Sequence, residues 1–301
     1  MTNQKYICSV CGSEKYSSKI SATDKRYRTT DRVFDVIECE NCHVAQTVPQ
    51  PSEAEMGSFY PEIYYPTEPS TESYYTTFVE LPQMDKVRII QRYRKDGKLL
   101  DVGCGVGHFV VTANRNGYEA EGLEYSETAA NSGRTRWNLT ITTGDFLSAQ
   151  IPPASFDIIT LWQVFEHLRQ PREVLQKINT LLRPGGLLVI AVPNIGSVQA
   201  KIFKSNWYHL DVPRHLFHYS PNSLSPLVAS CGFEVKQIDF NSPEHNYAGY
   251  LGSVMRLSPP GESFIHKLVR KTVGIYTARA FAAAEKVAGT GGIFTIAAVK
   301  K

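Results

Sequence analysis

Four cysteines near the N-terminus have the spacing of metal ligands. Cys8 and Cys11 form one C-x-x-C pair, and Cys39 and Cys42 form a second. In a zinc ribbon each pair sits on a tight turn that directs two thiolates at one ion, so two pairs complete a closed tetrahedron. A redox pair explains one C-x-x-C but not two, and His43 is expected to be a bystander. We therefore predict a structural zinc ion with no open coordination position.

An acid followed by alternating glycines marks a second site. The run LLDVGCGVGHF places Asp101 at the end of an apolar stretch and then Gly103, Gly105 and Gly107 at every second position. Glycines let the backbone approach a ligand closely, and the acid can accept a hydrogen bond from an amino group. A dinucleotide fingerprint, G-x-G-x-x-G, has its third glycine one residue later. The spacing therefore argues against a nicotinamide cofactor but does not exclude one.

Two histidines are candidate proton acceptors. His167 lies in WQVFEHL and His215 in PRHLFHYS, which follow two strand-like apolar runs. Ligands of open α/β sheets bind beyond the carboxyl ends of the strands, where these residues are expected. An imidazole with a pKa near neutrality can take a proton from a nucleophile. The competing interpretation is that both are core or helix-capping histidines.

Regular alternation of strands and helices must position these residues. From about residue 84, helical periodicity alternates with the apolar runs KLLDV, YEAEGLE, LTIT, FDIITLW and LLVIAV, and FEVKQIDF and GIFTIAAVK end the series. This pattern predicts an α/β fold with a Rossmann-like, seven-stranded, doubly wound sheet. We expect the last strand to be antiparallel beside the sixth, after a helical insertion at about 242–291.

Composition suggests three parts. Residues 1–48 form the zinc ribbon, 49–82 a linker or lid rich in Tyr, Glu and Pro, and 83–301 the main domain. Five linker tyrosines either pin the segment to the domain, belong to a disordered segment, or wall a small-molecule pocket as part of a lid. They are Tyr60, Tyr64, Tyr65, Tyr74 and Tyr75.

The motif from Asp101 to Gly107 resembles the first motif of class I methyltransferases that use S-adenosylmethionine. The resemblance implies that Asp101 receives the amino group of the cofactor's methionine part and that Glu124 binds the ribose hydroxyls. It also implies that Asp145 binds the adenine amino group, with Phe146 as an apolar neighbour of the ring. Further predicted cofactor contacts are Cys104, Tyr125 and Gln163.

The segments around the two histidines resemble ubiquinone-type and sugar-modifying members of that family. Sugar C-methyltransferases also begin with a four-cysteine zinc domain, and their H-E-H-x-S-Y-F-S stretch aligns its second His with His215. Arg214 stands where those enzymes have Glu, which puts the C-methyl outcome in doubt and leaves O- or N-methylation open. The resemblance implies a small-molecule substrate, such as a sugar, nucleotide sugar or related precursor, with His215 or His167 as the general base.

Charge and composition limit the kinds of binding partner that we expect. The net charge is +3, residues 1–50 hold seven Lys and Arg against six Asp and Glu, and residues 51–80 hold six Glu and no Lys or Arg. No basic stripe therefore leads to the site, which disfavours the alternative of a zinc-ribbon RNA methyltransferase. A cofactor-binding protein without catalysis is a further alternative.

The insertion carries a basic, amphipathic stretch. Phe264, Ile265 and Leu268 recur near helical spacing with Lys267 and Lys271 among them. This is either a helix that caps the domain or a surface that meets an anionic substrate or a membrane. No leader or membrane-spanning run is found, so we expect a cytoplasmic protein. The oligomeric state is left open.

Overall fold

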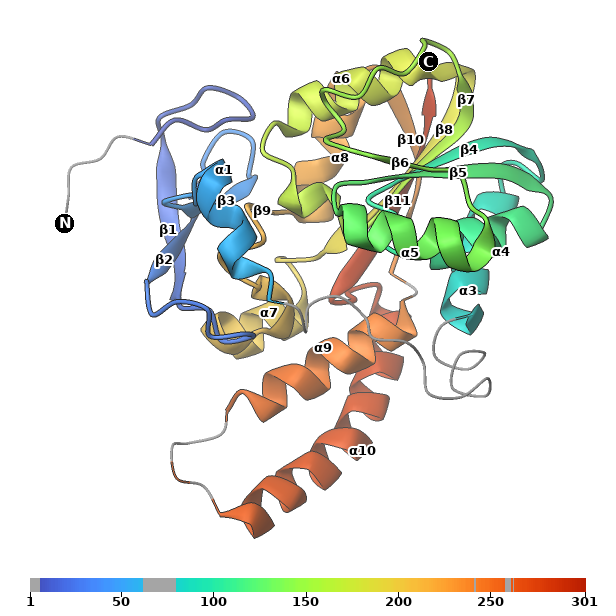
Figure 1. Ribbon diagram of the computed structural model, residues 1–301. Coiled ribbons are helices and arrows are strands. Elements are labelled where there is room, and N and C mark those ends of the chain that lie inside the picture. The colour runs from blue at the N-terminus through green and yellow to red at the C-terminus, as the bar shows by residue number, and fades with distance from the viewer. Residues whose placement is uncertain (1–5, 62–79, 241, 258–260, 262) are drawn as a thin grey trace.

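One mixed sheet of seven strands forms the centre of the main domain, as expected (Figure 1). Its strand order is β10-β11-β8-β7-β4-β5-β6. The strands are β4 (Gly97–Val102), β5 (Tyr118–Glu124), β6 (Ile141–Thr143), β7 (Phe156–Trp162), β8 (Leu182–Pro193), β10 (Phe233–Asp239) and β11 (Ile293–Lys300). The structure is a computed structural model, and it describes residues 6–61, 80–240, 242–257, 261 and 263–301.

The central strands are parallel, and their apolar runs are buried on both faces. β4 pairs in parallel with β5 and β7, and β7 pairs in parallel with β8. In β8 the six residues from Leu187 to Val192 are all buried, which is typical of a parallel sheet covered on both sides. β11 is antiparallel to both β8 and β10, which confirms the expected last strand beside the sixth.

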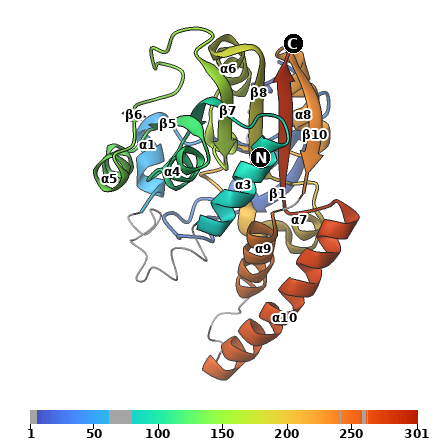
Figure 2. The ribbon, with the colours of Figure 1, turned by 90° about the vertical axis from the view of Figure 1, so that its right-hand side faces the viewer.

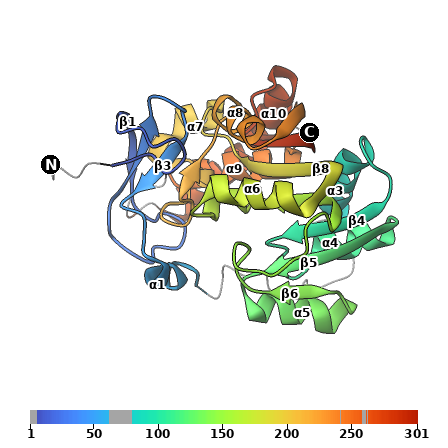
Figure 3. The same ribbon diagram turned by 90° about the horizontal axis from the view of Figure 1, so that it is seen from above.

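Helices cover the two faces of the sheet in two layers (Figure 3). One layer packs on Leu99, Ile158 and Val189, and the other packs on Leu100, Ile159 and Ile190. The first layer consists of α3 (Leu81–Gln91), α4 (His108–Arg115) and α5 (Glu127–Trp137). The second consists of α6 (Pro171–Leu181) and α8 (Pro221–Ser230). Adjacent strand residues therefore face opposite layers, as the pleat requires.

The N-terminal unit is a small antiparallel sheet completed by the main domain. Its strands are β1 (Tyr16–Ala22), β2 (Phe34–Cys39), β3 (Ala45–Val48) and β9 (Phe217–His218), in that order. β9 comes from the loop after β8 and pairs Phe217 with Gln46 and His218 with Ala45. Val10 and Val44 lie in one core cluster with residues of α6 and α8. The unit therefore shares a core with the main domain, and the boundary at residue 48 stays a prediction.

The connecting segment begins with ordered elements. α1 (Glu53–Met56) opens with a capping box in which Ser52 accepts from the Glu55 N–H and the Glu55 side chain accepts from the Ser52 N–H. A 3₁₀ turn, η1 (Gly57–Phe59), follows and leads to Tyr60. The other four tyrosines considered for a lid, at 64, 65, 74 and 75, lie outside the described residues.

The insertion before the last strand is helical, as expected. α9 (Pro243–Met255) and α10 (Phe264–Ala288) form a hairpin that projects from the body below the sheet (Figures 1 and 2). Between β8 and β9 lie α7 (Val198–Phe203), η5 (Lys204–Asn206) and η6 (Tyr208–Leu210), and η4 (Phe165–His167) follows β7. Within the described ranges, every helix is too short or too polar to span a bilayer.

Candidate active site

The glycine turn after β4 leaves an open approach to the backbone. Gly103, Gly105 and Gly107 have φ values of +71°, +57° and +82°, a region that glycine enters without strain. A Cβ on Gly103 would lie 2.5 Å from Val164, and one on Gly107 would lie 2.5 Å from Leu139. A Cβ on Gly105 would meet nothing within 4 Å. The outer two glycines thus serve close packing, whereas Gly105 faces space in which a ligand can approach.

Glu124 lies directly beside this turn. It ends β5, and its Oε2 accepts a hydrogen bond of 2.8 Å from the Gly105 N–H. Its Oε1 accepts one of 2.9 Å from the Ser126 N–H. The structure thus brings the predicted ribose ligand and the glycine turn to one sheet edge.

Asp101 is buried at the end of β4. Its Oδ1 accepts a hydrogen bond of 2.7 Å from the Thr160 hydroxyl, and burial raises the pKa of Asp101 to about 7. Cys104, in the glycine turn, is also largely enclosed, and burial raises the pKa of its thiol well above the usual range. Near neutral pH Cys104 is thus a protonated, unreactive thiol.

The other predicted cofactor residues lie just beyond neighbouring strands. Tyr125 is 72% exposed, and Asp145 is exposed with its carboxylate accepting from the Ser148 N–H. Phe146 is buried, with the Lys177 ammonium 5.3 Å from its ring centre. Gln163 has a positive φ, and its N–H donates to the Ala191 carbonyl.

The two predicted histidines meet beyond β7 and β8. The ring centres of His167 and His215 are 4.7 Å apart and the rings are nearly perpendicular. The His167 Nδ1 lies 3.0 Å from the Arg214 carbonyl oxygen, and the His215 Nδ1 lies 2.9 Å from the His209 carbonyl oxygen. A carbonyl can only accept, so both Nδ1 atoms carry the proton and both Nε2 atoms present a lone pair. The Tyr60 hydroxyl also lies 3.1 Å from the His167 Nδ1.

Two carboxylates border the His215 imidazole. Its Nε2 lies 3.9 Å from Glu166 Oε1 and 3.8 Å from Asp211 Oδ2. Burial lowers the pKa of His167 to about 4 and that of His215 well below its usual value, so both rings are neutral near pH 7. Burial raises the pKa of Glu166 to about 8. Although burial opposes it, the positive charges of Arg26 and Arg214 hold the pKa of Asp211 well below its usual range.

Arg214 ties this site to the N-terminal unit. Its fully buried guanidinium donates to Asp24 at 2.6 and 3.0 Å, to Asp211 at 2.7 Å and to the Phe59 carbonyl at 2.9 Å. We call Asp24, Arg214 and Asp211 the buried clasp. Sequence reasoning noted Arg214 only as a departure from a motif and missed Asp24 altogether. Arg214 cannot act as a base, because an arginine stays protonated.

The four cysteines converge on one point. The Cys8 and Cys42 sulfurs are 3.6 Å apart, the Cys11 and Cys39 sulfurs are 3.5 Å apart, and all four lie within 4.8 Å of one another. None forms a disulfide. The donor set fits a tetrahedral thiolate site for zinc.

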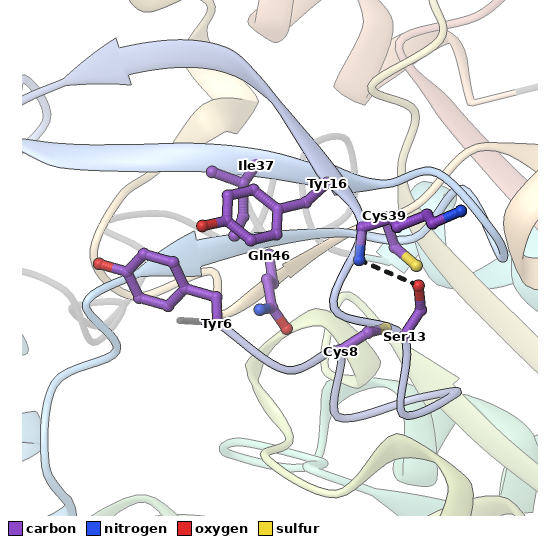
Figure 4. A pocket seen from close by; sticks show the side chains of 8 residues that line it. Tyr6, Cys8, Ser13, Tyr16, Ile37, Cys39 and Gln46 are labelled. Carbon is purple, nitrogen blue, oxygen red and sulfur yellow. Dashed lines mark hydrogen bonds between the residues drawn. The ribbon is translucent and has the colours of Figure 1, made fainter. Parts of the chain in front are cut away.

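A narrow pocket borders the sulfurs on the side of the N-terminal sheet (Figure 4). Side chains from β1, β2 and β3 line this pocket. The labelled lining residues are Tyr6, Cys8, Ser13, Tyr16, Ile37, Cys39 and Gln46.

Comparison with known families and proteins agrees with this architecture. A methyltransferase domain family matches residues 81–238, which is more than half of the chain. A probable S-adenosylmethionine-dependent methyltransferase of Mycolicibacterium smegmatis is 29% identical over 142 residues, covering 46% of this chain and 52% of that protein. A ubiquinone biosynthesis O-methyltransferase of Leptothrix cholodnii is 30% identical over 105 residues, covering 32% of this chain and 44% of that protein. The chain thus spans about half the length of these relatives.

Solved structures share the fold at low identity. A Haloferax volcanii complex of the Trm112 methyltransferase activator with a putative methyltransferase includes a chain with a TM-score of 0.52 and 16% identity, covering 78% of this chain and 99% of that chain. The [4+2]-cyclase SpnF gives a TM-score of 0.51 and 19% identity, covering 78% of this chain and 85% of its own. These likenesses show the fold alone, and the second structure is named for a cyclase. The chemistry must therefore be argued from the site.

Proposed function

Because the chain belongs to the methyltransferase domain family that its residues 81–238 match, we propose that it transfers a methyl group from S-adenosylmethionine to a small molecule. The observation that carries this proposal is the open glycine turn at Gly105 with two acids beside it at the same sheet edge. An enclosed turn would favour a purely structural role. This turn instead offers its backbone and a carboxylate to a ligand.

The donor set at this edge fits the cofactor. Asp101 would hold the methionine ammonium, because a carboxylate and a cation form a strong charge-assisted hydrogen bond. Glu124 would accept from the ribose hydroxyls, and Asp145 and Phe146 would meet the adenine. Tyr125, Gln163 and Cys104 complete the proposed lining, Cys104 through its backbone. When bound, the cofactor supplies a methyl group on a positively charged sulfur, which needs no acid to leave.

A neutral imidazole at this position suits the remaining task, which is to remove a proton from the nucleophile. We propose that the Nε2 of His215, or that of His167, accepts this proton, since both atoms present a lone pair. The Asp211 carboxylate, 3.8 Å from the His215 Nε2, would stabilise the imidazolium that forms. A hydroxyl-bearing substrate such as a sugar or nucleotide sugar fits this chemistry.

Glu124→Ala is expected to weaken binding of S-adenosylmethionine by about 1–3 kcal/mol, because a charged acceptor for two hydroxyls is lost. Isothermal calorimetry measures this directly. Glu121→Ala is the matched control, since Glu121 lies on the same strand and pairs with Lys98 away from the glycine turn. Equal affinities of the Glu124→Ala and unchanged proteins for S-adenosylmethionine would show that Glu124 does not bind the cofactor.

We propose that the four cysteines hold one structural zinc ion, supported by the convergence of their sulfurs. The ion would join the two cysteine turns that contribute to the shared core. Elemental analysis of the purified chain tests this proposal, and a folded chain without metal would contradict it.

α10 is the proposed contact with an anionic lipid surface or lipid-linked substrate. Phe264, Ile265 and Tyr276 are 79%, 69% and 69% exposed, and Lys267 and Lys271 are exposed on the same helix. A helix with exposed apolar and basic side chains binds in the interface of anionic membranes. Co-sedimentation should show binding to vesicles containing phosphatidylserine and weaker binding for Ile265→Glu. Equal recovery of both proteins with and without vesicles would exclude this role of α10.

A further inference from the structure

The Glu166 side chain is buried without a hydrogen bond from any described residue. The residue is 1% exposed, and neither carboxylate oxygen has a hydrogen-bond partner among the described residues. A buried polar group without a hydrogen bond costs free energy. Asp211, its neighbour across His215, is by contrast fully engaged by Arg214 and Arg26. The arrangement therefore points to a cationic ligand at Glu166.

The two imidazoles make the outer hydrogen bonds that are usual for metal-bound histidines. Each donates its Nδ1 proton to a backbone carbonyl, that of Arg214 for His167 and that of His209 for His215. This is the outer hydrogen bond that metal-bound histidines usually make, because it fixes the ring and directs the other nitrogen at the ion. One ligand atom from each of Glu166, His167 and His215 lies within 4.8 Å of the others.

We propose that Glu166, His167 and His215 form a binding site for one divalent transition-metal ion, separate from the four-cysteine cluster. Two imidazoles and a carboxylate are the ligand types that suit Zn²⁺, Co²⁺, Ni²⁺ or Fe²⁺, whereas Mg²⁺ and Ca²⁺ prefer oxygen alone. A bound ion would satisfy the Glu166 carboxylate and use both Nε2 lone pairs. On the basis of the proposed function, the ion and the proton removed from substrate compete for these nitrogens, so excess Zn²⁺ lowers turnover.

The test counts ions on the full chain. Protein purified with Zn²⁺ is exchanged into Co²⁺-containing buffer, desalted and measured by elemental analysis and visible absorption. We expect two ions per chain in the unchanged protein, with the ion at Glu166 lacking the sulfur-to-cobalt charge-transfer band of the cysteine site. Glu166→Gln and His215→Ala should each bind one ion, and the control His266→Ala, which changes an exposed histidine of α10, should bind two. Calorimetry with S-adenosylmethionine and circular dichroism would establish that the variants are folded.

Bound cobalt that all shows the sulfur-to-cobalt band in the unchanged protein, or an ion without that band that survives both Glu166→Gln and His215→Ala, would overturn the proposal. The ion count uses no turnover, so its failure leaves methyl transfer standing. Conversely, a protein that binds the second ion but transfers no methyl group would overturn only the proposed function. Turnover unaffected by Zn²⁺ in a protein with two ions would overturn the competition between ion and proton.

Discussion

His215→Ala is expected to lower the rate of methyl transfer by about a hundredfold to ten-thousandfold, which is the usual contribution of a general base. The His215 Nε2 presents a lone pair because its Nδ1 donates to the His209 carbonyl. Removing the ring removes the proton acceptor but leaves the glycine turn and Glu124 in place. The loss should therefore fall on kcat, measured with a hydroxyl-bearing substrate, while cofactor affinity measured by calorimetry stays unchanged.

Two further variants separate a base from a structural histidine. His167→Ala should also reduce turnover, and the larger of the two losses identifies the base. Asp85→Ala, which removes an exposed ion pair on α3, should leave the rate as it is. Full activity of both His167→Ala and His215→Ala would show that neither imidazole accepts the proton. A loss confined to KM would instead indicate substrate binding.

Asp24→Ala is expected to destabilise the whole protein by about 3–5 kcal/mol, because it leaves the buried Arg214 guanidinium without its main partner. Both side chains of this pair are completely buried, and Asp24 also accepts from the N–H groups of Arg26, Tyr27 and Thr29. Since Arg214 also holds Asp211, 3.8 Å from His215, turnover should fall with stability. Urea denaturation followed by circular dichroism gives the free energy of unfolding.

The matched control is Asp85→Ala, which removes an exposed ion pair with Arg88 on α3. Exposed pairs contribute little, so its unfolding midpoint should stay close to that of the unchanged protein. Asp24→Asn retains the shape and one acceptor and should lose less than Asp24→Ala. If Asp24→Ala unfolds at the same urea concentration as Asp85→Ala, the clasp does not hold the N-terminal unit to the site.

The sheet could be predicted because its signals are local. Apolar runs of strand length alternate with helical periodicity, and two runs, YEAEGLE and FDIITLW, coincide with β5 and β7. The order of residues also placed Asp101, Glu124, His167 and His215 at one edge, since parallel strands end on the same side. Contacts between distant segments carry no such periodicity.

Three features of the site therefore escaped prediction. β9 consists of two residues, too short for any pattern, yet it completes the N-terminal sheet. The Asp24–Arg214 pair joins residues 190 positions apart. Nothing in the sequence distinguishes either residue from an exposed, solvated charged residue. The burial of Glu166 is not visible in the sequence, because no pattern shows that both oxygens of its carboxylate lack a hydrogen-bond partner among the described residues.

Calorimetric titration of the purified chain with S-adenosylmethionine and with S-adenosylhomocysteine tests the central claim most directly. Because the open turn at Gly105 and the carboxylates of Asp101 and Glu124 fit the cofactor, we predict saturable binding of both compounds with one site per chain. The same titration with NAD should release no heat of binding, because the third glycine stands one residue too early for the dinucleotide fingerprint. Failure of both sulfur compounds to bind a folded chain, or binding of NAD in their place, would contradict the account.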